Sequence, residues 1–171
     1  MKKIFNFFIR DIPIHIIMLM TALLPNHAIT TRIRGMMLRP FFKKCGKGLK
    51  VASGVIILKP DKIEIGENVY IAHNVWINAV GGLIIEDGVI ISPFSVIDTS
   101  KHKFEDGAVT HKSSFNKIKI GKGTWITAHC VITDNVVIEN GVLVAANSVV
   151  THNVDKNTMI GGVPAKFIKK I

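Results

Sequence analysis

This chain of 171 residues has only two cysteines, lacks long apolar runs in its first part, and has a single acidic residue, Asp11, among its first 50 residues. The two cysteines, Cys45 and Cys130, are far apart, which excludes a disulfide framework and a cysteine-based metal site and favours a reducing compartment. The longest early stretch without charge, histidine or proline, Ile16 to Leu24, has nine residues, whereas a membrane-spanning helix needs about 20. Because 48% of the residues are apolar and 20% are charged, the chain is expected to bury a sizeable core.

Basic charge is concentrated at the start of the chain. Residues 1–50 hold ten Lys and Arg residues and one acid, Asp11, which is a net charge of +9. The remaining 121 residues hold twelve basic and eleven acidic residues, which is a net charge of +1. No later segment interleaves basic with aromatic side chains, so no nucleic-acid partner is expected despite a pI near 9.8.

The N-terminal segment, residues 1–48, is predicted to form two short helices, roughly 4–23 and 27–43, broken at Leu24-Pro25-Asn26 because proline ends a helix. Arg10 and Asp11 interrupt the apolar zone and argue against a secretory signal. Two interpretations stay open. The helices pack as a cap on the body or on a neighbouring subunit, or residues 1–43 make a peripheral contact with anionic lipids.

A six-residue period governs the chain from residue 51 onwards. Fourteen hexads, from VASGVI to VTHNVD, all begin with Ile or Val. This pattern predicts an all-β fold, a hexapeptide β-helix over residues 49–155, in which three hexads form one coil and about five coils stack. The tail, residues 156–171, is expected to form a strand, a turn and a short helix.

One long interruption breaks the period. Residues 100–117 read SKHKFEDGAVTHKSSFNK, which is polar and too long for a coil corner. An ejected loop is predicted here, because a regular solenoid can stack around an insertion at little cost in stability. Such a loop serves function or assembly, or it is a tolerated insertion without a role.

The hexads, the histidine-bearing loop and the ending Ile160-Gly161-Gly162-Val163-Pro164-Ala165-Lys166 resemble one family. It is the hexapeptide-repeat acyltransferases, nearest the maltose and galactoside O-acetyltransferases and their surface-polysaccharide relatives. The resemblance implies a left-handed parallel β-helix, a homotrimer with active sites between subunits, and acetyl-CoA as donor. A cytoplasmic location, with a possible peripheral position at the inner face of the cell membrane, fits both the cysteine usage and the N-terminal segment.

Two residues match the catalytic positions of that family. His102, in Asp98-Thr99-Ser100-Lys101-His102, matches the catalytic histidine, which can take the proton of a sugar hydroxyl as it attacks a thioester. Asn78 matches an asparagine near the acceptor and the developing oxyanion. Its alternative role is that of a common corner residue. Val80-Gly81-Gly82 lacks the acidic sugar ligand of the sugar acetyltransferases, which leaves the acceptor open.

The donor site implied by the resemblance is mostly backbone. Its members in this sequence are Ala128, Ala146, Thr151, Lys166, Lys169 and Trp125. Small side chains would let the pantetheine arm lie against the helix, and the two lysines would face the CoA phosphates. Trp125 is either a wall of the site or an aromatic that packs between subunits.

His73, His129 and His152 are expected to be solvated or at subunit contacts, while His111 in the loop could lie near the site but has no counterpart in the family. Zinc-binding hexapeptide proteins carry two histidines five apart, and this sequence has no such pair, so no metal site is predicted. The expected function is acetyl-CoA-dependent O-acetylation of a sugar in a surface glycan or its lipid-linked precursor. The alternatives are N-acetylation of an amino sugar nucleotide, acetylation of a small molecule, and a non-catalytic β-solenoid scaffold.

Overall fold

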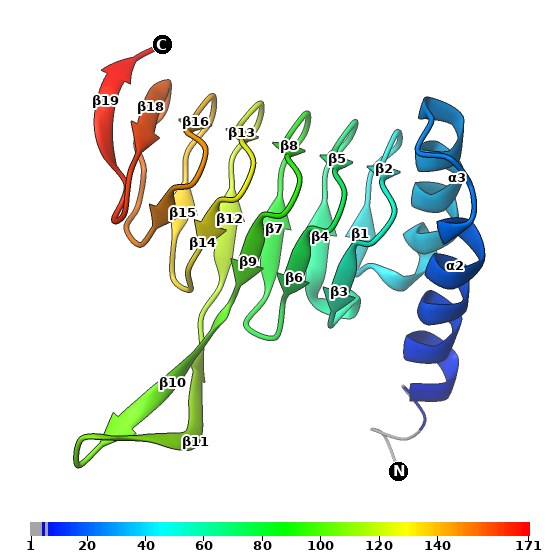
Figure 1. The fold of residues 1–171 in the computed structure, drawn as a ribbon, viewed down its shortest axis with the longest axis horizontal. Coiled ribbons are helices and arrows are strands. Elements are labelled where there is room, and N and C mark those ends of the chain that lie inside the picture. Colours follow the sequence, from blue (N-terminus) through cyan, green and yellow to red (C-terminus); the bar gives the residue numbers. More distant parts are fainter. Residues whose placement is uncertain (1–4, 6) are drawn as a thin grey trace.

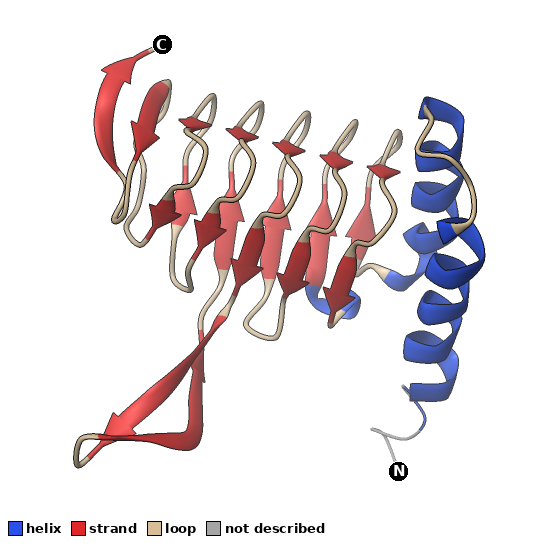
Figure 2. Cartoon of the chain, viewed as in Figure 1, coloured by secondary structure: helices blue, strands red, loops and turns tan. Residues whose placement is uncertain are grey.

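Short parallel strands stack into the three faces of a triangular prism in the computed structural model, which describes residue 5 and residues 7–171 (Figures 1 and 2). Face A contains β1 (Lys44–Cys45), β4 (Ile63–Ile65), β7 (Leu83–Ile85), β12 (Ile118–Ile120) and β15 (Val137–Ile138). Face B contains β2 (Lys50–Val51), β5 (Tyr70–Ile71), β8 (Ile90–Ile91), β13 (Trp125–Ile126), β16 (Leu143–Val144) and β18 (Thr158–Gly161). Face C contains β3 (Ile56–Leu58), β6 (Trp76–Asn78), β9 (Val96–Asp98), β14 (Val131–Ile132) and β17 (Val149–Val150).

The hexad period produces this prism. Each hexad supplies one strand and one corner, and its leading Ile or Val points inward. Thirteen of the fourteen leading residues are buried, and Ile57 in the first coil is half-buried. Each stacks on its equivalents above and below, as Ile71 of β5 pairs with Val51 of β2 and Ile91 of β8. The predicted parallel β-helix is confirmed, with five coils and an incomplete sixth.

Corner positions adopt left-handed backbone conformations. Asn68, Asn74 and Asn147 have φ values of 55° to 59°, a region that asparagine tolerates better than most residues because its side chain bonds locally. Phe94 is a costly exception at φ 61°. Its ring stacks on the His129 imidazole of the next coil, with centroids 5.0 Å apart.

The interruption of the period is a β-hairpin. β10 (Ser100–Glu105) and β11 (Ala108–Phe115) pair antiparallel and project from the prism (Figure 1). The predicted ejected segment is confirmed, and it takes the form of a hairpin. The signal was Asp106-Gly107, which connects the strands with two consecutive positive φ angles of 52° and 78°, the backbone of a type I′ hairpin turn.

Two helices cover the N-terminal end of the prism. A π-helical turn, η1 (Phe7–Asp11), leads into α2 (Ile12–Ala22), and α3 (Ala28–Leu38) continues into a 3₁₀ turn, η2 (Arg39–Phe41). A further 3₁₀ turn, η3 (Pro60–Lys62), lies at a corner of the first coil. The expected two helices and the break between them are confirmed, while the expected start of the first helix at residue 4 lies outside the described residues. None of the helices among the described residues is both long and apolar enough to cross a bilayer.

Arg34 fastens this cap to the first coil. Its guanidinium is fully buried and donates to Thr21 Oγ1 (2.9 Å), to the Thr21 carbonyl (2.7 Å) and to the Val51 carbonyl (2.8 Å). Burial lowers the pKa of Arg34, but a guanidinium remains charged at neutral pH because its ordinary pKa is so high. The buried charge is therefore held by acceptors from α2 and β2 at once.

The C-terminal tail pairs back on the prism as a strand. β19 (Lys166–Lys170) runs antiparallel to β18 along the free edge of face B. The short helix expected in this tail is wrong. The residues Lys166 to Lys170 instead satisfy the backbone groups that the last strand of a sheet would leave unpaired.

A substitution at Gly35 tests how closely α3 packs against the first coil. A Cβ at this position would lie 2.1 Å from the Leu49 carbonyl oxygen, so α3 would have to move off the first coil. We expect Gly35→Ala to destabilise the protein by about 2–4 kcal/mol, which lowers Tm by roughly 5 °C or more. Calorimetry measures this, with Met36→Ala on the exposed side of α3 as the control. Equal Tm values for the two variants would contradict the close packing.

Candidate functional site

A polar network lies where face C meets face A, at the base of the hairpin. Asn78 ends β6 and Asp98 ends β9, and the two pair side by side in neighbouring coils. Asn78 Nδ2 donates to Asp98 Oδ1 (3.0 Å) and to Ser100 Oγ (3.1 Å). The same Asp98 oxygen accepts from the Ser100 backbone N–H (2.9 Å) and hydroxyl (2.7 Å). One carboxylate thus fixes both the amide and the first residue of β10.

This network determines which way the Asn78 amide points. A carboxylate only accepts, and the Ser100 hydroxyl already gives its proton to Asp98, so both must receive N–H groups from Asn78. Both hydrogens of Nδ2 are then engaged. Oδ1 is held only by a long contact of 3.4 Å from the Val80 N–H. The free capacity of Asn78 is therefore that of an acceptor.

His102 lies two residues beyond Ser100 on β10 and is exposed. Alternate residues of a strand share a face, so His102 follows Ser100 on the side that meets Asn78, about 6–7 Å further along. A register shift between His102 and Phe104 marks an irregularity of the hairpin at this point. Such bulges re-aim side chains.

The hairpin also fixes the tautomer of His102. Its Nδ1 lies 3.2 Å from the Thr110 carbonyl oxygen and 3.3 Å from Ser113 Oγ. A carbonyl only accepts and the Ser113 hydroxyl can also accept, so this pair of contacts favours the neutral tautomer with the proton on Nδ1 and the basic lone pair on Nε2. The partner strand thereby presents Nε2 as a base.

The residues expected at the donor site lie elsewhere on the prism. Ala128 and Ala146 occupy corners between faces B and C in successive coils, where the Asn147 N–H donates to the Ala128 carbonyl (3.1 Å). Trp125 on β13 is about half exposed and donates from Nε1 to Ser92 Oγ (2.9 Å). Lys166 and Lys169 are exposed on β19.

Thr151 follows β17 at the edge between faces C and A, where its hydroxyl contacts His152 Nδ1 at 2.8 Å. Asn78 and the start of the strand that carries His102 therefore lie on one edge of face C, and Ala128 and Ala146 lie on the opposite edge. A single copy does not unite the two groups.

Sequence reasoning missed the roles of Asp98 and Ser100 and the anchoring of His102 by Thr110 and Ser113. A signal was available for Asp98. Asn78 and Asp98 are the second residues of their hexads, and equivalent hexad positions in adjacent coils stack.

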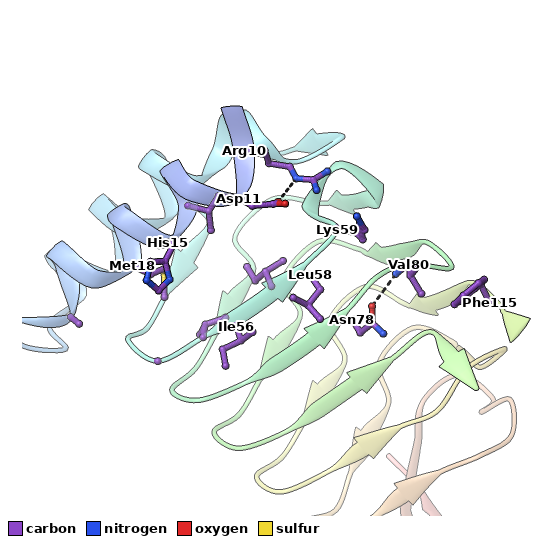
Figure 3. A pocket seen from close by; sticks show the side chains of 15 residues that line it. Arg10, Asp11, His15, Met18, Ile56, Leu58, Lys59, Asn78, Val80 and Phe115 are labelled. Atoms are coloured by element: carbon purple, nitrogen blue, oxygen red, sulfur yellow. Dashed lines mark hydrogen bonds and ion pairs between the residues drawn. The ribbon is translucent and has the colours of Figure 1, made fainter. Parts of the chain in front are cut away.

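Asn78 also lines a hollow of about 700 Å³ between α2 and the first two coils (Figure 3). Phe115, which pairs with Ser100 at the hairpin base, lines the same hollow. The polar network thus lies at one end of a cavity walled by the cap.

Asp98 can be tested as the organiser of this network. Asp98→Ala leaves the Asn78 amide and Ser100 without their shared acceptor, and we expect a loss of about 1–3 kcal/mol in stability with faster amide hydrogen exchange across residues 100–115. The control is Glu105→Ala, which removes an exposed ion pair with Lys112 on the same hairpin and should cost little. Unchanged exchange in Asp98→Ala would refute this role.

Known proteins similar to this chain share its repeat. A family model described as bacterial transferase hexapeptide (six repeats) matches residues 117–152. The galactoside O-acetyltransferase of Escherichia coli K12 is 27% identical over 149 residues, covering 85% of this chain and 73% of that protein. The putative lipopolysaccharide biosynthesis O-acetyl transferase WbbJ of the same organism is 31% identical over 137 residues, covering 73% and 67%.

A solved structure matches most of the chain. It is a hexapeptide-repeat acetyltransferase of Vibrio cholerae O1 biovar eltor complexed with acetyl coenzyme A. It superposes with a TM-score of 0.79 at 25% identity, over 92% of this chain and 85% of that one. The match extends beyond the repeats to the N-terminal part of the chain.

Proposed function

The chain belongs to the family of hexapeptide-repeat acetyltransferases, and from this premise we propose that it transfers an acetyl group from acetyl-CoA to a sugar hydroxyl of a surface glycan or its lipid-linked precursor. The observation that carries the proposal is the hairpin contact of 3.2 Å between His102 Nδ1 and the Thr110 carbonyl oxygen, which favours a proton on Nδ1 and leaves Nε2 as a base. Relatives named for O-acetyl transfer to galactosides and in lipopolysaccharide biosynthesis support the substrate class.

His102 acts as the general base. A sugar hydroxyl is almost un-ionised at neutral pH and attacks a thioester poorly. Nε2 takes the hydroxyl proton as the oxygen bonds to the thioester carbon, and the imidazolium returns that proton to the sulfur as the carbon–sulfur bond breaks. The hydrogen bond from Nδ1 to the Thr110 carbonyl keeps the ring in one orientation during both proton transfers.

Asn78 orients the acceptor. Its Nδ2 hydrogens are committed to Asp98 and Ser100, so in this arrangement Oδ1 is the group that can meet the substrate. Oδ1 would accept a hydrogen bond from a sugar hydroxyl and hold it near Nε2 of His102. A role as oxyanion donor would require breaking the bond to the Asp98 carboxylate.

The donor would lie along the opposite edge of face C. Ala128 and Ala146 leave room for a slender pantetheine arm parallel to the prism axis, and Lys166 and Lys169 supply cations for the CoA phosphates beyond it. The exposed ring of Trp125, one strand from this edge, would form a wall.

A homotrimer would join the two edges. The outer side of face C carries a continuous apolar row from the second coil to the fifth, Trp76, Val96, Val131 and Val149. The equivalent row of face A is less apolar, because it contains the charged residues Lys44, Glu64 and Lys119. Threefold packing of face C sets one edge of each chain against the other edge of the next. Thr151 would then face the donor across the interface.

The catalytic proposal predicts a large effect of one histidine. His102→Ala should lower kcat for acceptor-dependent thiol release from acetyl-CoA by about 10²–10⁴-fold, because the general base is lost. His111→Ala, on the same hairpin, is the matched control and should retain the rate. A His102→Ala enzyme that keeps most of its activity would show that the base lies elsewhere, with His111 next to test.

The acceptors in this assay are free sugars, oligosaccharides, lipid-linked glycans, amino sugar nucleotides and small amines. Thiol release that occurs only with amino sugars would establish N-acetylation in place of O-acetylation. No release from any acceptor, together with no binding of acetyl-CoA, would leave a non-catalytic β-solenoid scaffold.

A peripheral position at the inner face of the cell membrane is part of the proposal. The outer side of the cap exposes Leu19, Leu23 and Met36, at 63%, 90% and 64%. Arg10 and Arg34 are buried with protein partners, and Lys43 pairs with Glu64. Among the described residues of this segment, the exposed cations left for lipid headgroups are Arg32, Arg39, Lys44 and Lys47. Apolar side chains beside lysine and arginine are the composition of an interfacial anchor.

Point variants test this contact, because deleting residues 1–43 would strip α3 from the first coil. The double variant Leu19→Gln with Leu23→Gln should lower the partition coefficient onto phosphatidylglycerol vesicles by about tenfold or more, since two leucines that would enter the bilayer interface are lost. Phe104→Gln with Val109→Gln, on the exposed hairpin, is the control. Flotation assays that find equal binding for both pairs would disprove the membrane contact.

A further inference from the structure

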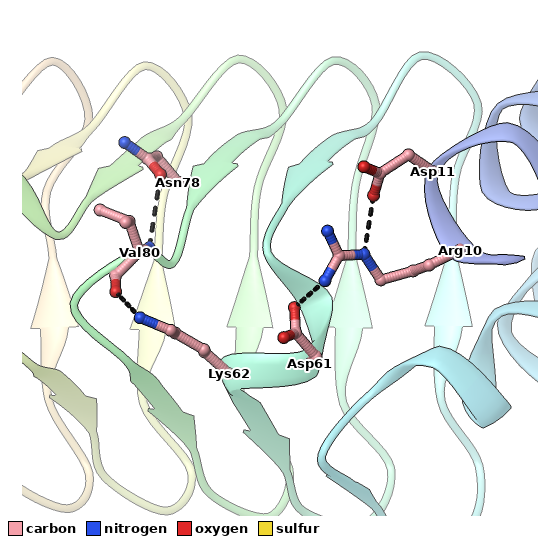
Figure 4. Close-up of polar contacts among 6 residues, drawn as sticks. All are labelled: Arg10, Asp11, Asp61, Lys62, Asn78 and Val80. Carbon is pink, nitrogen blue, oxygen red and sulfur yellow. Dashed lines mark hydrogen bonds and ion pairs between the residues drawn. The ribbon is translucent and has the colours of Figure 1, made fainter. Parts of the chain in front are cut away.

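The hollow beneath α2 is held open by specific polar contacts at both ends of the helix. One end of the helix is tied down by Arg10, which is buried and pairs with Asp11 and with Asp61 at the corner of the first coil (Figure 4). The hydrogen bond with Asp11 and the charge of Asp61 both raise the pKa of Arg10. This end of the helix therefore stays charged and anchored.

The other end is tied down just after α2. Asn26 Nδ2 donates to Ser53 Oγ (2.7 Å), and Asn26 Oδ1 accepts from the Ser53 N–H (3.0 Å). The two anchors lie on opposite edges of face C, so α2 spans the rim of the first coil between them, and Ile14, Ile17 and Met18 pack in part against the core. The middle of the helix forms the roof of the hollow, which Ile14, His15 and Met18 line, and Figure 3 shows His15 and Met18 side by side on it.

The floor of the hollow is apolar and uncovered. Ile56 and Leu58 of β3 are 53% and 43% exposed, although they lie under the helix. Val80 and Phe115 continue the apolar lining to the hairpin base. The volume of about 700 Å³ is in the range of small-molecule sites. Exposed apolar surface in a concave site marks a place for an apolar ligand.

The two ends of the hollow differ in chemistry. Asn78 and Phe115 lie at the end next to Ser100 and the strand that carries His102. Beside it, Lys62 Nζ holds the Val80 carbonyl and so fixes the corner that forms this end (Figure 4). A molecule with its apolar part under α2 would therefore present an attached polar group to Oδ1 of Asn78.

We propose that the hollow beneath α2 binds the hydrocarbon chain of the acceptor, so that the substrate is a sugar linked to a lipid chain rather than a free sugar. This inference rests on the proposed acetyl transfer for the identity of the polar group. The occupant is a slender chain and not a second copy of the protein, because α2 roofs the floor at Ile56 and Leu58 and keeps a flat partner face away from it. The outer side of the same helix faces the proposed membrane contact.

Binding without catalysis is the first measurement. The fluorescent chain 11-(dansylamino)undecanoic acid should bind the full-length protein, n-octyl β-D-glucoside should displace it, and methyl β-D-glucoside should not. Affinity of alkyl glucosides should rise about two- to fourfold per added methylene until the hollow is full. No saturable binding of the dansyl chain would overturn the proposal.

Three variants test whether the hydrocarbon chain binds in the hollow. Met18→Trp fills the hollow and should abolish dansyl-chain binding, while Met20→Trp makes the same substitution on the outer side of α2, where Met20 is 67% exposed, and should leave it unchanged. Ile56→Gln makes the floor polar at an already exposed position, so it tests the site even if Met18→Trp folds poorly. Chain binding that survives both Met18→Trp and Ile56→Gln would overturn the proposal.

Acetyl-transfer assays distinguish a failure of the hydrocarbon-chain site from a failure of the proposed acetyltransferase function. With a sugar that accepts acetyl groups, kcat/KM should rise with alkyl chain length in the native enzyme and lose that dependence in Ile56→Gln. Equal kcat/KM for methyl and octyl glycosides would overturn the chain site and leave the acetyltransferase standing. Chain binding without transfer to any acceptor would leave the hollow standing as a lipid site and remove the acetyl-transfer proposal.

Discussion

The stacking of Ile and Val inside the prism is the constraint on which the other features depend. Because each leading side chain must rest on its equivalents in adjacent coils, every hexad position forms a straight row along the axis, with coils about 4.8 Å apart. Asn78 and Asp98, twenty residues apart, meet because they hold the same hexad position. The same rows align Ala128 with Ala146 and extend an apolar stripe along face C. Side chains far apart in sequence are thus positioned by a core that takes no part in chemistry.

The fold and the place where the hairpin leaves the prism could be predicted because the hexads repeat a simple physical rule. The leading residues from Val51 to Val150 report burial directly, and the end of the period after Ile97 marks where His102 emerges. The remaining details depend on contacts between segments that no period relates. The hairpin depended on the turn chemistry of Asp106-Gly107, and the C-terminal strand on an edge that needed a partner. The orientation of the Asn78 amide could not be read from sequence, because it follows from which neighbours can only accept hydrogen bonds. The hollow under α2 depends on two distant anchors, at Asp61 and Ser53.

The division of the proposed site between two edges gives assembly a chemical role. An exposed histidine on a projecting hairpin has little to exclude water, and a thioester laid along the opposite edge would be out of its reach in the same chain. Packing of face C against a second copy would bury the apolar row, enclose His102 and bring a donor edge to it in one step. Solenoids suit this arrangement, since a straight edge of one copy matches a straight edge of the next over several coils.

The composition of α2 fits a helix with apolar surroundings on two sides. Apart from His15 and Thr21, its residues from Ile12 to Ala22 are all apolar, so no polar face is reserved for water. A helix that is apolar all round is normally buried in a core or in a membrane, yet Leu19 and Met20 face outward and Met18 faces a hollow. Lipid on the outer side and a lipid chain on the inner side would satisfy both surfaces together. An acceptor drawn from the bilayer would then pass around a single helix to reach Asn78 and His102, with its chain remaining in apolar contact along the way.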